Sequence, residues 1–220
     1  MATYDLEQQE QLEDVKHFWK KYGNLITWVL ILALAAYAGW TGYRYWQQKR
    51  GLAAAGLYEE LDRAVQAGDA AKASKAFDDI TANYAGTTYA EQGALLAARA
   101  QLAASKDDAA RAALQWEVEH GKNKDLVAIA RLRLAGLLMD AKQYDPALKA
   151  LEADMPAGFK PLADDRRGDV LMAQGKSAEA IKAYEAAWKD MAPTVEYRRF
   201  VEGKLIALGH APQASAAASN

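Results

Sequence analysis

Cysteine is absent from this chain of 220 residues. Its absence excludes disulfide bonds, thiolate metal sites and cysteine nucleophiles together. Histidine is scarce, and the three that occur, His17, His120 and His210, include no H-x-x-x-H pair of the kind that binds zinc on a helix. We interpret them as solvated side chains at the ends of helices. The sequence predicts no metal site and no cofactor.

Sequence motifs of common enzyme classes are also missing. No G-x-x-x-x-G-K-[ST], G-x-G-x-x-G or G-x-S-x-G stretch occurs, so the chain lacks the phosphate-binding loops and serine elbows that these motifs mark. Adjacent acids do occur, and we expect each pair to lie on a solvated helix face or at a helix start. The pairs are Glu59-Glu60, Asp78-Asp79, Asp107-Asp108 and Asp164-Asp165. The sequence therefore predicts a protein that is not an enzyme.

Charge of one sign does not gather in this chain. The 27 Lys and Arg residues are interspersed with 29 Asp and Glu residues, so no basic stripe is available to follow a phosphate backbone. Nucleic acid is therefore not an expected partner.

One long stretch, residues 22–43, contains no charged residue at all. As a helix rising about 1.5 Å per residue it reaches about 33 Å, enough to cross a hydrocarbon core of about 30 Å. Aromatic rings gather at both ends, as they do in the two headgroup zones of a bilayer. They are Trp19, Tyr22 and Trp28 at one end and Trp40, Tyr43, Tyr45 and Trp46 at the other. The pattern predicts a transmembrane helix surrounded by lipid.

A cleavable signal peptide is the main alternative for this stretch. Such a peptide has a basic start and an apolar core of about 7–15 residues, followed at once by small residues. Here five acids and three bases precede a longer core, and Arg44, Lys49 and Arg50 separate that core from the small residues of 53–55. A buried helix of a soluble protein, the other alternative, would not need rings at both ends. A retained anchor is the better interpretation.

The flanks and the small residues of the span bear on its orientation and pairing. Three bases lie close to it on either side, so the positive-inside rule alone leaves the orientation open. Ala35 with Gly39, and Ala38 with Gly42, form two small-xxx-small pairs that allow close approach of another helix. Glycine and alanine are also common in membrane helices that do not pair.

The remainder of the chain has the composition and periodicity of helices. It is rich in Ala, Leu, Lys and Glu and poor in β-branched runs. Apolar residues recur three and four apart, as in Leu132, Ala135 and Leu138, which is typical of amphipathic helices. Breaks such as those at residues 67–69 and 174–176 leave segments of the length of paired antiparallel helices.

A small residue followed by a larger one recurs along this helical part. Ala180 precedes Tyr184, Ala147 lies 33 residues earlier, and Ala110 and Ala73 continue the series at intervals of 37 residues. The pattern matches the tetratricopeptide repeat, in which paired helices cross at small residues and each hairpin stacks on the next. The sequence predicts an all-α fold. It consists of a single transmembrane helix, a tetratricopeptide-like solenoid of about four helical hairpins, and a C-terminal capping helix.

The predicted boundaries divide the chain into four parts. They are an N-terminal segment over residues 1–21, the transmembrane helix with its interfacial end over 22–46, the repeat domain over 47–209, and a disordered tail over 210–220.

On the alignment to the tetratricopeptide pattern, the first helix of each hairpin is expected to line the concave surface, and stacked arrays use such surfaces to bind partners. For the two clearest repeats the candidate residues are Leu132, Met139, Asp140, Asp165, Asp169 and Met172. Methionine suits an adaptable binding surface, and core packing is an equal alternative for Met139 and Met172.

The order of these features resembles one family. Its most specific part runs from Val15-Lys16-His17-Phe18-Trp19, ahead of the span, to the Tyr43-Arg44-Tyr45-Trp46 that closes it. With an acidic start and degenerate tetratricopeptide hairpins behind the span, the chain is similar to the YfgM-like family of ancillary SecYEG translocon subunits.

The resemblance implies a non-enzymatic protein of the bacterial inner membrane, with its N-terminus in the cytoplasm and its repeat domain in the periplasm. It implies association with SecYEG and with a PpiD-like membrane-anchored isomerase, and a part in handing unfolded secreted chains to periplasmic chaperones. The alternative from the residues alone is a membrane-anchored scaffold for cell-envelope or cell-division assembly.

Overall fold

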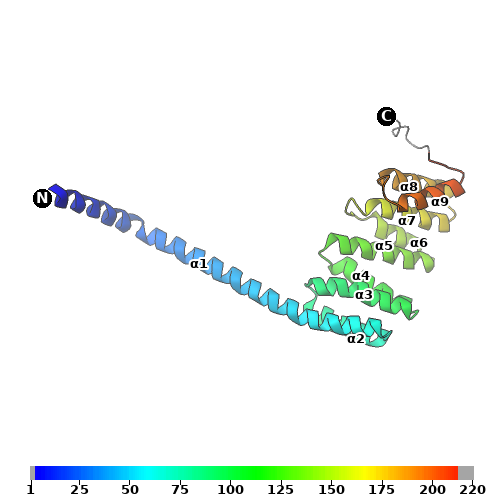
Figure 1. Cartoon of the computed structure of the whole chain (residues 1–220), viewed down its shortest axis with the longest axis horizontal. Helices are drawn as coiled ribbons and strands as arrows, with labels where there is room; N and C mark the ends of the chain where they lie inside the picture. Colours follow the sequence, from blue (N-terminus) through cyan, green and yellow to red (C-terminus); the bar gives the residue numbers. More distant parts are fainter. Residues whose placement is uncertain (1–2, 213–220) are drawn as a thin grey trace. The chain divides into compact units, whose positions relative to one another are not determined.

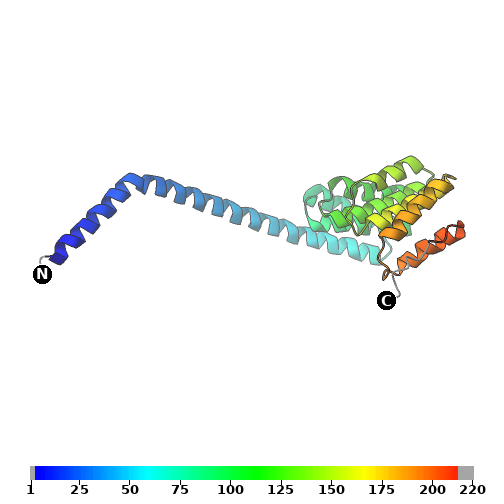
Figure 2. The same ribbon diagram turned by 90° about the horizontal axis from the view of Figure 1, so that it is seen from above.

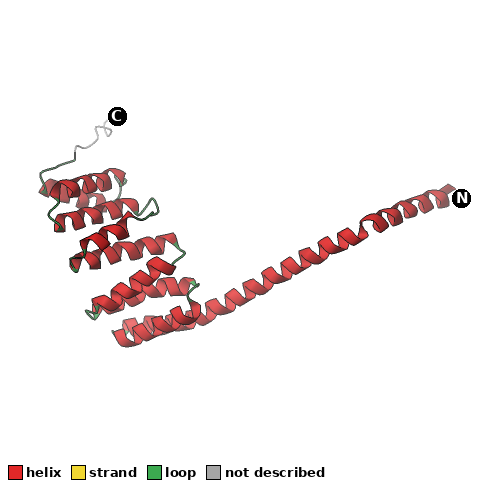
Figure 3. Ribbon diagram, turned by 180° about the vertical axis from the view of Figure 1, so that it is seen from behind, coloured by secondary structure: helices red, strands yellow, loops and turns green. Residues whose placement is uncertain are grey.

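The computed structural model describes residues 3–212, with side chains from residue 16 onward. All regular structure in this part of the chain is helical (Figure 3). The helices are α1 (Thr3–Gln66), α2 (Ala70–Tyr84), α3 (Thr88–Ala103), α4 (Asp107–His120), α5 (Lys124–Asp140), α6 (Tyr144–Glu152), α7 (Lys160–Ala173), α8 (Ser177–Asp190) and α9 (Tyr197–Ala207). The predicted all-α fold is confirmed.

The chain divides into two compact units, residues 1–50 and 51–220. The predicted boundary between anchor and repeat domain lies four residues earlier, and the predicted domain limits stay a prediction. Most of the predicted disordered tail, residues 213–220, lies outside the described residues.

The first unit contains the candidate membrane span. The part of α1 from Lys16 onward is long and apolar enough to cross a membrane, and none of its most apolar window is buried. Leu25, Leu30 and Leu34 are among its exposed side chains. Because exposed leucine is unfavourable in water, this surface is suited to contact with lipid.

The two ends of the apolar stretch carry aromatic rings paired with cations. Lys21 Nζ lies 5.4 Å from the ring centre of Tyr22 at one end, and Lys49 Nζ lies 4.9 Å from that of Tyr45 at the other. Such pairs fit the zone where lipid headgroups meet the acyl chains. At Gly39 and Gly42, the residues expected to allow helix pairing, an added Cβ would meet no atom within 4 Å.

In the second unit, the hairpins stack in chain order from α2 to α8 (Figure 1). The end of α1 shares a buried core with α2 through residues such as Leu61 and Ala73. The pairs α3–α4, α5–α6 and α7–α8 follow. α9 packs against α8 at the C-terminal end of the stack (Figure 2). Four hairpins and a terminal capping helix are the arrangement that the sequence predicts.

The small residues of the repeats lie where the predicted pattern puts them. Ala73, Ala110, Ala147 and Ala180 are all completely buried. Larger buried residues at the second position of each repeat fill the space beside them. They are Phe77, Leu114, Leu151 and Tyr184. One continuous core therefore runs from the end of α1 to α7, and a second core joins α7, α8 and α9.

The turn inside each hairpin has the same backbone form. Gly68, Ser105, Lys142 and Gly175 all have positive φ angles. At each turn the next residue's N–H bonds back to a carbonyl five residues earlier, as from Lys176 to Leu171 at 2.9 Å. This is the Schellman ending, which satisfies the carbonyls left free at the end of the first helix.

Candidate partner-binding groove

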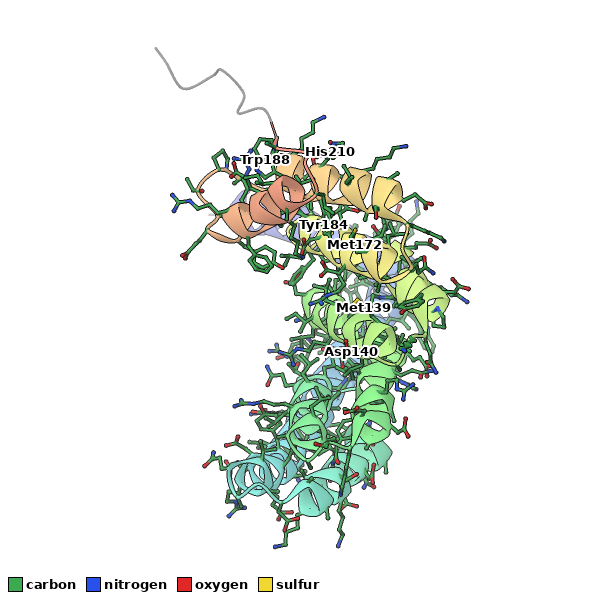
Figure 4. All side chains as sticks on the ribbon, turned by 90° about the vertical axis from the view of Figure 1, so that its right-hand side faces the viewer. Met139, Asp140, Met172, Tyr184, Trp188 and His210 are labelled. Carbon is green, nitrogen blue, oxygen red and sulfur yellow. The ribbon has the colours of Figure 1, made fainter. Side chains whose placement is uncertain are left out.

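The candidate groove residues of the third hairpin lie on α5. Leu132 and Met139 are half-buried and pack against the main core, whereas Asp140 is exposed in the last turn of the helix. Figure 4 places Met139 and Asp140 at the same side of the stack as Met172 of the next hairpin. Met139 therefore serves packing, and Asp140 is free to face a partner.

The candidate residues of the fourth hairpin lie on α7. Met172 is half-buried against the second core, and Asp169 is likewise half-buried. Asp165 is only 2% exposed. The structure brings the two carboxylates together one helical turn apart, on the side of α7 that faces α9.

Lys204 of α9 joins these two carboxylates. Its Nζ lies 2.8 Å from Oδ1 of Asp165 and 2.6 Å from Oδ1 of Asp169. The Tyr197 hydroxyl donates to Asp165 at 2.8 Å, and the Tyr184 hydroxyl donates to Asp169 at 2.9 Å. We call these five residues the α7–α9 network. In this network the hydroxyl and ammonium groups donate to the carboxylate oxygens, and such pairing of donors with acceptors is the condition for a stable buried network.

The electrostatics of the network favour the protonated tyrosines. Burial raises the pKa of Tyr184, and its hydrogen bond to Asp169 raises it further. Burial and the hydrogen bond to Asp165 raise the pKa of Tyr197 in the same way. Both phenols therefore remain donors, and the Lys204 ammonium also lies 5.0 Å from the ring centre of Tyr184. The arrangement fixes α9 on α7.

The interpretation of Asp164-Asp165 as a solvated pair is wrong. Asp164 is 6% exposed and Asp165 is 2% exposed. Arg167, one turn along the helix, lies 3.0 Å from Asp164. The error arises because α9 and the end of α8 cover this part of α7, which the local sequence does not reveal. The other three acid pairs are exposed as predicted.

Lys204 and Tyr197 bond to candidate residues of α7, and sequence reasoning missed both. Lys204 lies 39 residues from Asp165 along the chain, outside the repeat pattern. The spacing of Tyr184 predicts a packing role only and does not indicate the hydrogen bond from its hydroxyl to Asp169. No spacing within the repeats indicates them, because the contact depends on how α9 docks on α7.

The acidic and histidine side chains of the described residues form no cluster of three that could hold a metal ion. The charged groups of the α7–α9 network bond to one another, and these bonds hold α9 against α7. Any partner that binds Asp165 or Asp169 directly must compete with α9. Partner contact by the six candidate residues stays a prediction, with Asp140 the most accessible.

Comparison with known proteins gives consistent results over nearly the whole chain. A family model described as a tetratricopeptide repeat-like domain matches residues 16–210. The ancillary SecYEG translocon subunit of Neisseria gonorrhoeae is 33% identical over 209 residues, covering 94% of this chain and 100% of that protein. The protein of the same name from Escherichia coli is 30% identical over 201 residues, covering 89% of this chain and 94% of that protein.

A third relative, from Haemophilus influenzae, carries the same name and is 28% identical over 188 residues, 84% of this chain and 90% of that protein. The match extends through the candidate span as well as the hairpins, so it does not rest on the repeats alone. The resemblance inferred from the sequence is confirmed. The chain belongs to the family of tetratricopeptide repeat-like proteins named ancillary SecYEG translocon subunits.

Proposed function

We propose that this protein is a non-enzymatic adaptor of the SecYEG translocon, anchored in the bacterial inner membrane by α1. The observation that carries the proposal is the match to ancillary SecYEG translocon subunits over 94% of the chain, anchor and repeats together. The exposed apolar surface of α1 supports membrane anchorage. The stack of hairpins supports a binding role, because such arrays present extended surfaces to other proteins.

The proposed topology has residues 1–21 in the cytoplasm and the repeat domain in the periplasm. There the domain binds partner proteins, among them a PpiD-like membrane-anchored isomerase, and helps unfolded secreted chains pass to periplasmic chaperones. Asp140 and the half-buried Leu132 on α5 are the proposed contact residues. Contact at Asp165 and Asp169 requires a partner that displaces Lys204 of α9.

Co-purification tests the association. Full-length tagged protein is extracted in mild detergent, and bound proteins are identified by mass spectrometry. We expect SecYEG and the isomerase to be recovered. Recovery of only cell-division or envelope-assembly proteins would contradict the translocon role and favour the scaffold alternative.

A matched pair of charge reversals tests the groove in the same assay. Asp140→Lys changes an exposed residue of the proposed groove, and Asp78→Lys changes an exposed residue of α2 outside it. We expect Asp140→Lys alone to lower recovery of the isomerase. Equal recovery with both variants would place the contact elsewhere.

Protease protection tests the orientation. In right-side-out vesicles, added protease should degrade the repeat domain, and in inside-out vesicles it should remove only the N-terminal segment. The opposite result would overturn the proposed topology.

A further inference from the structure

Helix α6 is the shortest of the second helices in the hairpins. It has 9 residues, whereas α2 has 15 and α4 and α8 have 14 each. The chain leaves the helix at Ala153, whose ψ is 155°. Pro156 lies three residues further on. It has no N–H to donate and disfavours helical backbone at the residue before it. The final turn that the other second helices possess is therefore missing from α6.

Two adjoining cavities lie where α6 is short. One, of about 600 Å³, lies between α4 and α6 over α5. The other, of about 350 Å³, lies beside the end of α4 and the segment that follows α6. Val118 and Arg131 line both, so the two cavities form one depression, which we call the α4–α6 trough.

The floor of the α4–α6 trough is apolar. Leu134, Leu138 and Ala150 line the larger cavity, and Val127, Ala128 and Met155 line the smaller one. The larger cavity alone falls within the range of about 300–1,000 Å³ that is typical of ligand sites. The trough can therefore accept several apolar side chains from a bound segment.

The guanidinium of Arg131, in the α4–α6 trough, has an N–H group without a hydrogen-bond partner among the described residues. Nε of Arg131 is buried, and no hydrogen-bond acceptor lies in reach of it among the described residues. Arg111, at the far rim, is already bonded to Asp108 and to Gln143. A buried guanidinium N–H without an acceptor is unfavourable, and a carboxylate is its strongest partner.

The rest of the rim is also weighted towards positive charge. Apart from Arg111, whose charge is met by Asp108, the cations Lys122, Lys124, Lys149 and Arg131 line the two cavities, against the acids Glu119, Glu152 and Asp154. A bound acidic group would thus meet an excess of cations, which favours its approach and its orientation.

We propose that the α4–α6 trough is a docking site for a protein segment that is apolar and carries one Asp or Glu side chain. Its apolar side chains fill the floor, and its carboxylate bonds to the Arg131 guanidinium. The candidate groove residues Leu132, Met139 and Asp140 line neither cavity, so this second surface is independent of the groove and of the proposed function.

Matched peptides test the docking site. An array of 12-residue apolar peptides is made with a central Glu, and each peptide has a twin with Gln at that position. Full-length protein in lipid nanodiscs is applied, and affinities of the best pair are measured by fluorescence anisotropy. We expect the Glu peptide to bind about tenfold more tightly, a difference of about 1.4 kcal/mol. Absence of binding, or equal binding of the twins across the array, would overturn the proposal.

Two arginine variants assign the preference to a residue. Arg131→Gln should abolish the preference for Glu. Arg133→Gln makes the same change two residues along α5, outside both cavities, and should retain it. A preference that survives in Arg131→Gln would overturn the proposal.

A third variant keeps the test valid if Arg131→Gln unfolds. Ala150→Phe adds a ring to the larger cavity without changing charge, and it should weaken both twins at least tenfold. Unchanged binding would overturn the proposal. Binding that appears only after removal of residues 213–220 would also overturn it, because the chain's own tail would then be the occupant.

Discussion

The ring of Tyr184 lies directly against the Cα atom of Gly168. A Cβ built on Gly168 would stand 2.5 Å from Cδ1 and 2.8 Å from Cζ of the ring. Favourable carbon contacts lie at about 3.5–4.0 Å, so no side chain fits at this position. Because the hydroxyl of the same ring donates to Asp169, close approach of α7 and α8 also positions the α7–α9 network.

Gly168→Ala should therefore destabilise the repeat domain. Alanine gains about 1 kcal/mol over glycine in helix propensity, but overpacking a rigid ring costs about 1–3 kcal/mol and also shifts the hydroxyl from Asp169. We expect a net loss of about 1–2 kcal/mol. Denaturant unfolding of the full-length protein in detergent, followed by circular dichroism, measures it.

Gly203→Ala is the matched control for Gly168→Ala. It lies in α9, and a Cβ there meets no atom within 4 Å, so the propensity gain should appear alone as higher stability. The two variants should move the unfolding midpoint in opposite directions. Equal midpoints would show that Tyr184 can withdraw from Gly168 without loss.

Lys204→Met tests whether the α7–α9 network holds α9 against α7. The change leaves Asp165, which is 2% exposed, with a single remaining donor in Tyr197. Breaking a buried ion pair costs about 3–5 kcal/mol, and the partial exposure of Lys204 reduces this to about 2–3 kcal/mol. Relative to the wild type, Lys204→Met should speed hydrogen exchange of the amides in α9 more than of those in α5.

Lys160→Met is the control for that change. Its Nζ lies 3.9 Å from Oδ2 of Asp190, and the two side chains are 66% and 44% exposed. Such pairs contribute about 0–1 kcal/mol, so stability and exchange in α9 should stay unchanged. Equal effects of the two variants would contradict a specific role for the α7–α9 network.

The parts of the fold that follow from short-range patterns could be predicted from the sequence. Burial of Ala147 and Ala180 and the turns at Gly68 and Gly175 depend on residues within one hairpin, and the pattern predicts them correctly. Repetition strengthens the prediction, because each hairpin repeats the same packing problem.

The polar contacts of the candidate site depend on distant residues and could not be predicted. Lys204 meets Asp165 only because α9 docks on the last hairpin, and neither residue has a local signal for the other. Burial of Asp164 has the same origin. The trough at Arg131 depends on how far α6 extends, and the sequence predicts helix ends less well than helices.

Lys142 is a turn residue with a conformation that suits glycine. Its φ is 59°, in the left-handed region where a Cβ costs about 1–2 kcal/mol per residue. Lys142→Gly should therefore raise stability by about 0.5–1 kcal/mol after the greater entropy of the unfolded glycine chain is included. The reverse change, Gly175→Ala at the equivalent turn, should lower it by a similar amount. Thermal unfolding of both variants checks the pair, and a stability loss in Lys142→Gly would contradict it.

Glu117 is a completely buried acid in α4 whose two carboxylate oxygens have no hydrogen-bond partner among the described residues. Burial, and secondarily the nearby Glu91, raises its pKa to about 7 from the ordinary 4.5. Between pH 4.5 and 7 the folded state holds a proton that the unfolded state has lost, so the free energy of unfolding falls as pH rises through this window. Above pH 7 the contribution of Glu117 to the free energy of unfolding no longer changes, and it is about 3 kcal/mol lower than at pH 4.5.

Glu117→Gln removes the ionisation and should remove this slope. The variant should match the wild type near pH 4.5 and exceed it in stability at pH 8, by up to about 3 kcal/mol. Denaturant unfolding at several values from pH 4.5 to pH 8 measures both proteins. Glu119→Gln, at an exposed position two residues away, is the control and should keep the slope. Because a charged Glu91 raises the pKa of Glu117, Glu91→Gln should lower the upper end of the window and leave its lower end at pH 4.5. A wild-type curve without the fall would show that Glu117 is already ionised in the folded protein in this range, and a Glu117→Gln curve that keeps the fall would show that another group causes it.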